Sequence, residues 1–152
     1  MVHERLINSP VGLLTLRAED GALTAILFGD QRTGLPGSDQ ILDQAEAELK
    51  EYFAGERKEF TVPVRLTGTE FQKKVWAALA EIPYGGTATY GEIAARIGKP
   101  KACRAVGTAN HHNPVPIIVP CHRVIGAGGS LTGYGGGLEV KAYLLTLERH
   151  VQ

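Results

Sequence analysis

The chain has 152 residues, and its 16 Lys and Arg side chains balance 16 Asp and Glu to a formal net charge of zero. Hydrophobic and charged fractions of 43% and 21% indicate a folded globule of one domain or two small lobes, and they argue against a disordered chain. At first sight the zero sum also argues against a nucleic-acid binder, whose usual mark is a basic excess.

No apolar run reaches the roughly 20 residues that a bilayer span needs, and residues 1–10 lack the apolar core of a signal peptide. Two cysteines are too few for a disulfide framework. We therefore expect a cytoplasmic protein without a membrane partner. The spacing of the cysteines and the five histidines does not match a zinc finger, so no metal is expected.

The charges are unevenly distributed along the chain. Residues 1–70 hold seven basic and twelve acidic side chains, a net of −5, whereas residues 71–152 hold nine and four, a net of +5. This asymmetry indicates that the C-terminal half meets an anion. Chance drift of charge along a chain explains it equally well.

Residues 1–65 predict an α/β lobe. Three short runs separated by turn signals predict a small antiparallel sheet. These runs are residues 4–8, 12–16 and 22–28. From Ser38 to Phe53 the apolar side chains recur at helical spacing, and residues 60–64 predict a further strand.

Residues 66–152 predict a mostly helical lobe. Capping-box patterns begin two of its helices, at Thr69 to Gln72 and at Thr89 to Glu92. The second of these helices extends to Ile97, and about three residues later another is expected over 101–110. Two short helices joined in this way form a helix-turn-helix candidate.

The second helix of this pair carries Lys101 and Arg104 among small residues such as Ala105 and Gly107. Small side chains drive little burial, but they let a backbone approach a duplex closely. Many helix pairs of this shape never touch DNA, which is the alternative interpretation.

A last helix is predicted over residues 139–149. The residues expected on its apolar face are Val140, Tyr143, Leu144 and Leu147. The whole pattern therefore predicts an α/β N-terminal lobe, a small antiparallel sheet plus a helix. This lobe is joined to a mostly helical C-terminal lobe with a helix-turn-helix and an active-site cysteine.

Cys121 is the candidate nucleophile. Three prolines stiffen residues 114–120 before it, and His122 and Arg123 follow, either of which could stabilise a thiolate. The seven glycines of residues 126–137 would admit a ligand closely. These glycines match neither a phosphate loop nor a dinucleotide fingerprint, so no cofactor is expected.

His122 could act as a base through a water, with Glu148 as its orienting group. For Glu148 the alternative is an ordinary solvated carboxylate. A lone cysteine is more often a small buried hydrophobic residue than a nucleophile. We expect that role for Cys103, which lies in an alanine-rich helix.

Residues 113–124 read Asn-Pro-Val-Pro-Ile-Ile-Val-Pro-Cys-His-Arg-Val and closely resemble the active-site motif of the O6-alkylguanine-DNA alkyltransferases. This family is also called the methylated-DNA–protein-cysteine methyltransferases. The likeness covers about half of the chain, from Phe71 to Arg149, and residues 1–70 match only in length and layout. It includes the runs Tyr84-Gly85, Thr89-Tyr90-Gly91, Arg104-Ala105-Val106-Gly107, Gly133-Tyr134 and Leu144 to Glu148.

The resemblance implies roles for individual residues. Cys121 is similar to the acceptor that takes the alkyl group from O6 of guanine. His122 resembles the base that acts on it through a water, and Glu148 the carboxylate that orients this base. Asn113 matches the residue that ties the helix-turn-helix to the active-site segment. Tyr90 is similar to the tyrosine that crowds the flipped nucleotide's phosphate and donates to guanine N3.

The resemblance also implies a DNA surface and a pocket. Arg104 resembles the arginine finger that fills the gap left in the duplex. Further DNA contacts are expected from Lys99, Lys101, Ala105 and Gly107. The pocket is expected to be lined by Tyr134 and by main-chain groups of Cys121, Val124 and Gly135.

The implied partner is double-stranded DNA containing O6-alkylguanine, bound from the minor groove by a monomer. Repair of O4-alkylthymine and clustering of copies on DNA stay open. Residues 1–70 contain no cysteine, so the zinc-binding lobe of the vertebrate members is not supported and the bacterial small-chain type is the closer likeness. Gly135 stands where some members have serine, which leaves a more open pocket lip.

Two alternatives remain. A non-catalytic alkyltransferase-like lesion binder would lack the cysteine that stands here at Cys121. A cysteine hydrolase using Cys121, His122 and Glu148 would need an oxyanion-hole motif. None is evident, and that function leaves Arg104 and the helix pair unexplained.

Overall fold

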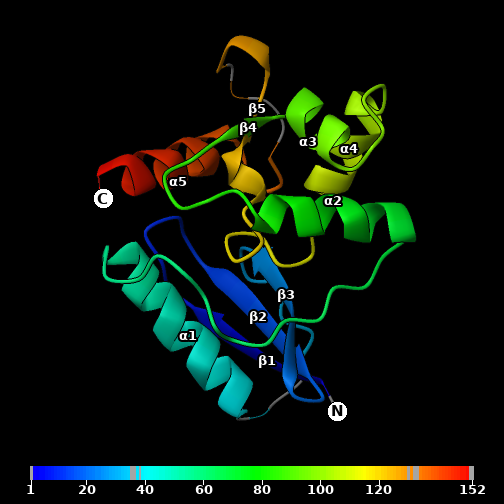
Figure 1. Cartoon of the computed structure of the whole chain (residues 1–152). Coiled ribbons are helices and arrows are strands. Elements are labelled where there is room, and N and C mark those ends of the chain that lie inside the picture. The colour runs from blue at the N-terminus through cyan, green and yellow to red at the C-terminus, as the bar shows by residue number, and fades with distance from the viewer. Residues whose placement is uncertain (1, 35–36, 38, 130, 132–133, 151–152) are drawn as a thin grey trace. The chain divides into compact units, whose positions relative to one another are not determined.

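The computed structural model describes the chain except for residues 1, 35–36, 38, 130, 132–133 and 151–152. The chain divides into two compact units, Met1–Thr67 and Gly68–Gln152 (Figure 1). The first unit is a small sheet with one helix and the second is mostly helical, which confirms the predicted fold class. Within the described residues, every helix is too short or too polar to span a lipid bilayer.

The first unit is built on a three-stranded antiparallel sheet in the order β1-β2-β3. Its strands are β1 (Val2–Ile7), β2 (Leu14–Glu19) and β3 (Ala22–Phe28). Helix α1 (Gln40–Phe53) packs against all three strands and buries an apolar stripe that includes Leu49 and Tyr52. Asp39 caps this helix by accepting from the Ile41 N–H, and Ser38, its expected start, lies outside the described residues.

The predicted strand at residues 60–64 is wrong. Val64 alone forms an isolated bridge to β3. The N–H groups of Thr61 and Val62 instead donate to Oε1 of the buried Glu48, at 2.9 and 3.1 Å. A side-chain carboxylate thus takes the hydrogen bonds that a neighbouring strand would have accepted.

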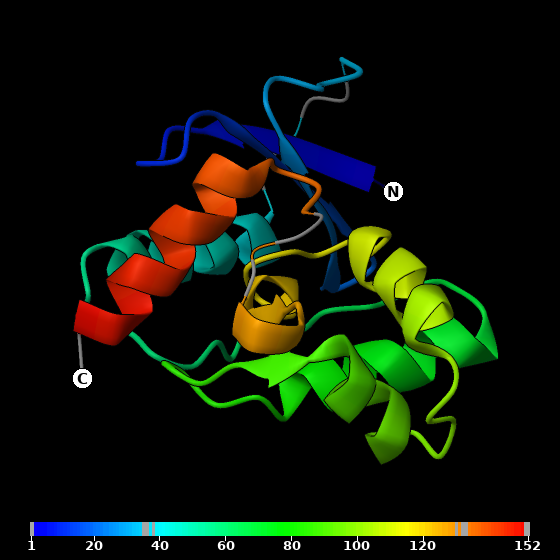
Figure 2. The same cartoon turned by 90° about the horizontal axis from the view of Figure 1, so that it is seen from above.

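The second unit, as far as it is described, contains four α-helices, two 3-10 helices and two short parallel strands. They are α2 (Glu70–Ala80), β4 (Ala88–Thr89), α3 (Tyr90–Arg96), α4 (Cys103–His111), η1 (Cys121–Arg123), β5 (Val124–Ile125), η2 (Ala127–Gly129) and α5 (Leu138–His150). Helices α2, α3 and α4 pack against one another, and α5 packs against η1 (Figure 2). Strand β5 follows η1 and pairs with β4, which leads into α3, so the cysteine segment is tied to the helix pair.

Both predicted capping boxes are confirmed. Thr69 and Gln72 bond reciprocally at the start of α2, and Thr89 and Glu92 do the same at the start of α3. Each box satisfies two N–H groups at a helix start, where intrahelical partners are lacking. The second box fixes Tyr90 as the first residue of α3.

The helix pair is present, but α4 begins later than predicted. Its first residue is Cys103, so Lys101 lies in the connection over residues 97–102. This connection is closed by a main-chain bond from Ala102 N to Lys99 O at 2.9 Å. The turn delays the helix because these residues bond among themselves before the first helical turn.

The buried face of α5 differs from the predicted one. Its buried residues are Lys141, Leu144, Leu145 and Glu148. Tyr143, which the hydrophobic pattern placed on the inner face, is 39% exposed. Two charged side chains therefore point inward, which an apolar periodicity cannot reveal because it assigns charges to solvent.

Glu48→Gln tests the carboxylate that organises residues 61–62. Burial alone would raise the pKa of Glu48, but hydrogen bonds from Gln44, Thr61 and Val62 hold that pKa below its ordinary value. We expect the substitution to lower the free energy of unfolding of this unit by about 1–3 kcal/mol, because it faces an NH2 group toward donors. Hydrogen exchange of the α1 amides measures the loss.

The effect carries a pH signature. The pKa of Glu48 is lower in the folded protein than in the unfolded chain, so the ionised carboxylate stabilises the folded unit. This stabilisation is complete above the unfolded pKa of about 4.3 and is lost as the pH falls through the folded pKa. The exposed Glu59 provides the matched control, since Glu59→Gln should change stability by less than about 0.5 kcal/mol. Equal losses in the two variants would contradict the role given to Glu48.

Candidate active site around Cys121

Cys121 begins η1, at the end of a segment with constrained backbone. Ile117 adopts a φ of 74°, a left-handed conformation that β-branched residues rarely adopt. Asn113 holds this segment from both sides, because its Nδ2 donates to Val119 O at 2.8 Å and its Oδ1 accepts from Val115 N at 2.9 Å. Asn113 thus links the end of α4 to the turn that presents the cysteine.

Cys121 is buried, with 3% of the residue exposed. Burial raises its pKa to about 11, although a hydrogen bond with Asn113 and the nearby Lys141 and Tyr134 each favour the thiolate. The resting side chain is therefore a neutral thiol at neutral pH. Nucleophilic chemistry at this sulfur requires a base to remove its proton.

His122 and Glu148 form a fully buried pair. His122 Nε2 donates to Glu148 Oε2 at 2.6 Å, and the two side chains are 0% and 1% exposed. This bond selects one tautomer of the neutral ring, since an ionised carboxylate can only accept. Burial lowers the pKa of His122 and Glu148 opposes this, while Arg123 and Lys141 lower it further.

The neutral ring leaves Nδ1 as a lone-pair acceptor. This atom is buried and has no hydrogen-bond partner among the described residues. A neutral imidazole with one nitrogen held by a carboxylate and the other open is the arrangement of a general base. Glu148, expected in one interpretation to be solvated, is instead the buried orienting group.

Arg123 does not face the thiol, contrary to one of the sequence expectations. Its Nε and Nη2 bind the two oxygens of Glu148 at 2.8 and 3.0 Å, and its Nη1 donates to Ile82 O at 2.7 Å. The guanidinium also lies 5.7 Å from the ring centre of Tyr84. Arg123 therefore holds the Glu148 carboxylate that in turn orients His122, a role that no spacing in the sequence indicates.

Lys141 is a second residue that the sequence reasoning missed. It is 0% exposed, and its Nζ lies 6.0 Å from the ring centre of Tyr90. The only available signal was its position on α5, seven residues before Glu148, which places the two side chains on one helix face.

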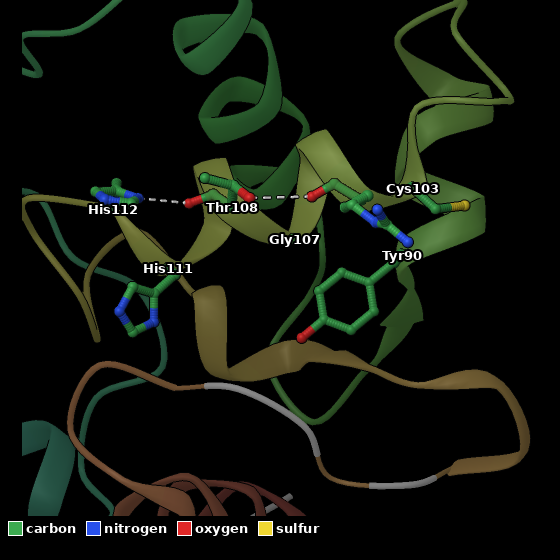
Figure 3. A pocket seen from close by; sticks show the side chains of 7 residues that line it. Tyr90, Cys103, Gly107, Thr108, His111 and His112 are labelled. Atoms are coloured by element: carbon green, nitrogen blue, oxygen red, sulfur yellow. Dashed lines mark hydrogen bonds between the residues drawn. The ribbon is translucent and has the colours of Figure 1, made fainter.

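The helix pair carries an open pocket of about 610 Å³ (Figure 3). The pocket is lined by Tyr90, Cys103, Arg104, Gly107, Thr108, His111 and His112. Tyr90 lies near the first turns of α4 and the two histidines lie at its other end. Cys103 is exposed, so its expected place in the core is wrong: it begins α4 on the surface of the pocket.

The other predicted contact residues fall into two groups. Four of the five expected DNA contacts are exposed, namely Lys99, Lys101, Arg104 and Ala105. Gly107 is half-buried, and a side-chain carbon there would lie 3.7 Å from the Tyr90 ring. Tyr134 and Val124 are buried, Gly135 is exposed, and Gly133 lies outside the described residues.

Among the described residues, no group of three or more His, Cys, Asp or Glu side chains could hold a metal ion. The site is built from a buried thiol, an oriented imidazole and a carboxylate, next to a helix pair with an exposed basic surface. This arrangement fits a protein in which a cysteine would act as the nucleophile beside a helix-turn-helix.

Comparison with known proteins identifies the family. Residues 70–150 match the DNA-binding domain of 6-O-methylguanine DNA methyltransferase, and residues 2–66 match its ribonuclease-like domain. The chain therefore belongs to the 6-O-methylguanine DNA methyltransferase family. The resemblance drawn from the sequence motifs is confirmed, and it extends to the N-terminal unit.

Similar proteins are known from bacteria and archaea. The methylated-DNA–protein-cysteine methyltransferases of Mycolicibacterium paratuberculosis and Methanosarcina acetivorans are 54% and 52% identical, covering 98% and 97% of this chain and 93% and 98% of their own. A crystal structure of Mycobacterium tuberculosis OGT in complex with DNA matches with a TM-score of 0.91 and 53% identity over 97% of this chain and 93% of that one. A Methanococcus jannaschii O6-methylguanine DNA methyltransferase matches with a TM-score of 0.70 and 33% identity, covering 95% and 93%.

Arg123→Ala tests the buried carboxylate cluster. The substitution removes three hydrogen bonds and leaves the Glu148 charge buried with a weaker partner. We expect a loss of about 3–5 kcal/mol in the free energy of unfolding. Urea unfolding followed by the fluorescence of Trp76, the chain's one tryptophan, reports on this unit.

The double variant Arg123→Ala with Glu148→Gln should recover part of that loss, because it also removes the uncompensated charge. Arg149→Ala removes an exposed arginine on the same helix as Glu148 and serves as the control. Additive losses in the double variant would show that the two residues act independently.

Proposed function

We propose that this protein repairs DNA by transferring the alkyl group of O6-alkylguanine in double-stranded DNA to its own Cys121. It is a methylated-DNA–protein-cysteine methyltransferase. The observation that carries the role of Cys121 is the buried His122–Glu148 pair, whose open Nδ1 belongs to the residue next to the thiol. The function is supported by relatives that match nearly the whole chain and are named methylated-DNA–protein-cysteine methyltransferases.

The transfer needs a proton path because the resting thiol is neutral. A water between Cys121 and His122 Nδ1 would carry the proton to the imidazole, and Glu148 would stabilise the imidazolium that forms. The sulfur lone pair then attacks the alkyl carbon, forming the C–S bond as the C–O6 bond breaks. The bonding electrons go to the guanine, which takes up the proton that the thiol released.

Tyr90 is proposed to assist the departing base. A hydroxyl donor at guanine N3 would stabilise the negative charge that develops as the C–O6 bond breaks. Tyr134, the main-chain groups of Cys121 and Val124, and the exposed backbone of Gly135 are proposed to line the pocket. The thioether product has no leaving group that this site can activate, so each chain reacts once.

The proposed DNA surface is the helix pair. A base within the duplex cannot reach a buried sulfur, so the damaged nucleotide must leave the stack at a cost of a few kcal/mol. Arg104, exposed on α4, is proposed to fill the gap that the nucleotide leaves. The small side chains of Ala105 and Gly107 would allow a minor-groove approach.

Lys99 and Lys101, both exposed in the turn before α4, are proposed to bind phosphates. The +5 charge of residues 71–152 supports DNA binding by this half of the chain. The alternative of a non-catalytic lesion binder has no support here, because the acceptor cysteine and its base are both present.

Labelled duplex DNA carrying O6-methylguanine tests the transfer. We expect one label per chain, on Cys121, and no further turnover with excess DNA. Cys121→Ser should abolish the transfer, whereas Cys103→Ser, which removes the exposed cysteine, should leave it unchanged. Label on Cys103, or repeated turnover, would contradict the proposal.

Arg104→Ala separates nucleotide extrusion from chemistry. We expect about a tenfold to hundredfold slower repair of duplex DNA, because the duplex loses the group that fills the gap, and little change with free O6-benzylguanine. The two rates are measured by loss of unmodified Cys121 over time. Arg149→Ala, a loss of the same charge on α5, is the control, and equal losses on both substrates would reject the finger role.

A further inference from the structure

Asn110 is a buried polar residue to which the mechanism above gives no role. It lies in the last turn of α4 and is 2% exposed. Its Nδ2 donates to the main-chain oxygen of Cys121 at 3.4 Å, whereas its Oδ1 is buried and has no hydrogen-bond partner among the described residues. Because a carbonyl oxygen can only accept, this contact fixes which end of the amide is Oδ1.

An unpaired buried acceptor has a cost that another residue at this position would avoid. Oδ1 gives up its hydrogen bonds to water on folding and gains none from the described part of the protein. A leucine has the same branching and would leave no polar atom unpaired. Such atoms are uncommon in folded proteins, so this one indicates a donor that a ligand brings.

Asn110 lies beside the groups that the proposed transfer uses. Its amide is hydrogen-bonded to the residue that carries the nucleophile. The next residue on α4, His111, lies against the proposed pocket lip, since a side-chain carbon at Gly135 would be 3.8 Å from the His111 carbonyl oxygen. Cys121 is itself buried, so a base that reaches the sulfur enters the same water-free region as Oδ1.

The damaged base carries a donor that fits this acceptor. Alkylation at O6 removes the proton from N1 of guanine, so the exocyclic N2 amine is the only N–H donor that the base keeps. O4-alkylthymine has no N–H donor, because alkylation removes the N3 proton and leaves only acceptors on its edge. An open acceptor in the pocket therefore distinguishes the two bases by hydrogen bonding.

We propose that Asn110 is a specificity-determining residue whose Oδ1 accepts a hydrogen bond from the N2 amine of the extruded O6-alkylguanine. The inference rests on the proposed transfer to Cys121. Oδ1 is already out of water in the free protein, so pairing with the amine costs no further desolvation of this acceptor. A base without the amine leaves Oδ1 unpaired and gains nothing from it.

The same amide would also fix the base relative to the sulfur. Through Nδ2 it holds the carbonyl of Cys121, so one side chain would contact both the nucleophile's main chain and the base. Asn113 holds Val119 O in a similar way, at 2.8 Å, but its Oδ1 accepts from Val115 N. Of these two asparagines, only Asn110 has an Oδ1 without a partner among the described residues.

The proposed hydrogen bond can be removed from the side of the base or from the side of the protein. O6-methylhypoxanthine is O6-methylguanine without the N2 amine, and Asn110→Leu removes the acceptor. We expect the wild type to react about tenfold or more faster with a duplex carrying O6-methylguanine than with one carrying O6-methylhypoxanthine. In Asn110→Leu this ratio of rates should fall about tenfold, because the amine has lost its acceptor.

The rates are measured as single-turnover loss of unmodified Cys121. Asn8→Leu, the same substitution at an exposed asparagine of the first unit, is the control and should leave the ratio unchanged. Asn110→Asp keeps an oxygen at the position of Oδ1, so it should retain most of the wild-type ratio.

The ratio separates recognition of the amine from a structural role. Loss of the Nδ2 contact to Cys121 alone would slow the reaction of both duplexes by the same factor. Equal slowing of both in folded Asn110→Leu, with the wild-type ratio unchanged, would overturn the proposal.

A second measurement needs no substitution at Asn110. The NMR shift of its side-chain carbonyl carbon is compared in Cys121→Ser bound to each of the two duplexes. We expect the shift to differ between them, because only O6-methylguanine brings a donor to Oδ1. The same shift with both duplexes would contradict the assigned hydrogen bond.

Failure of this inference is distinguishable from failure of the proposed function. A wild-type chain that accepts no methyl group on Cys121 from either duplex would reject the transfer itself. A wild-type chain that accepts it, with an Asn110→Leu variant of unchanged ratio, would reject only the role of Asn110.

Discussion

The second unit depends on one buried carboxylate. Glu148 accepts hydrogen bonds from His122, from two nitrogens of Arg123 and from the Gly85 N–H at 3.3 Å. These donors come from the segment after the cysteine and from the loop after α2, so a single side chain of α5 joins three parts of the chain. Its charge also sets the tautomer of His122 and therefore which nitrogen stays open for chemistry.

The same constraint couples stability to reactivity. An isolated buried carboxylate would be costly, and Arg123 compensates its charge. Without Arg123, the carboxylate of Glu148 would bind the shared proton more tightly than it does now. His122 would then no longer be held in a single tautomer. In the proposed mechanism, folding and function thus depend on the same buried cluster, so a substitution there should affect both.

The sequence predicted the local signals well and the long-range polar contacts poorly. The capping boxes at Thr69 and Thr89 were identified correctly because each is a four-residue interaction. The strand at 60–64 failed because Glu48, some thirteen residues away in the chain, takes its N–H groups. No local pattern carries that information.

The site shows the same division. The residues around Cys121 indicated the cysteine and its neighbouring histidine, with Glu148 as a possible orienting group, and the family resemblance implied the same three roles. The burial of Lys141 and the hydrogen bonds from Arg123 to Glu148 depend on packing between α5 and η1. Hydrophobic periodicity cannot predict such contacts because it assigns charged residues to solvent. Cys103 was placed wrongly because small residues around it suggested burial where α4 begins at the surface.

The two cysteines consequently have very different access to solvent, one exposed and one buried. A bulky maleimide dye should attach at Cys103 and leave the sulfur of Cys121 intact. Because Cys103 lies in the pocket of the helix pair, such a dye would sit where a duplex is proposed to bind. At this native thiol a bulky label should therefore compete with duplex DNA for the surface of the helix pair.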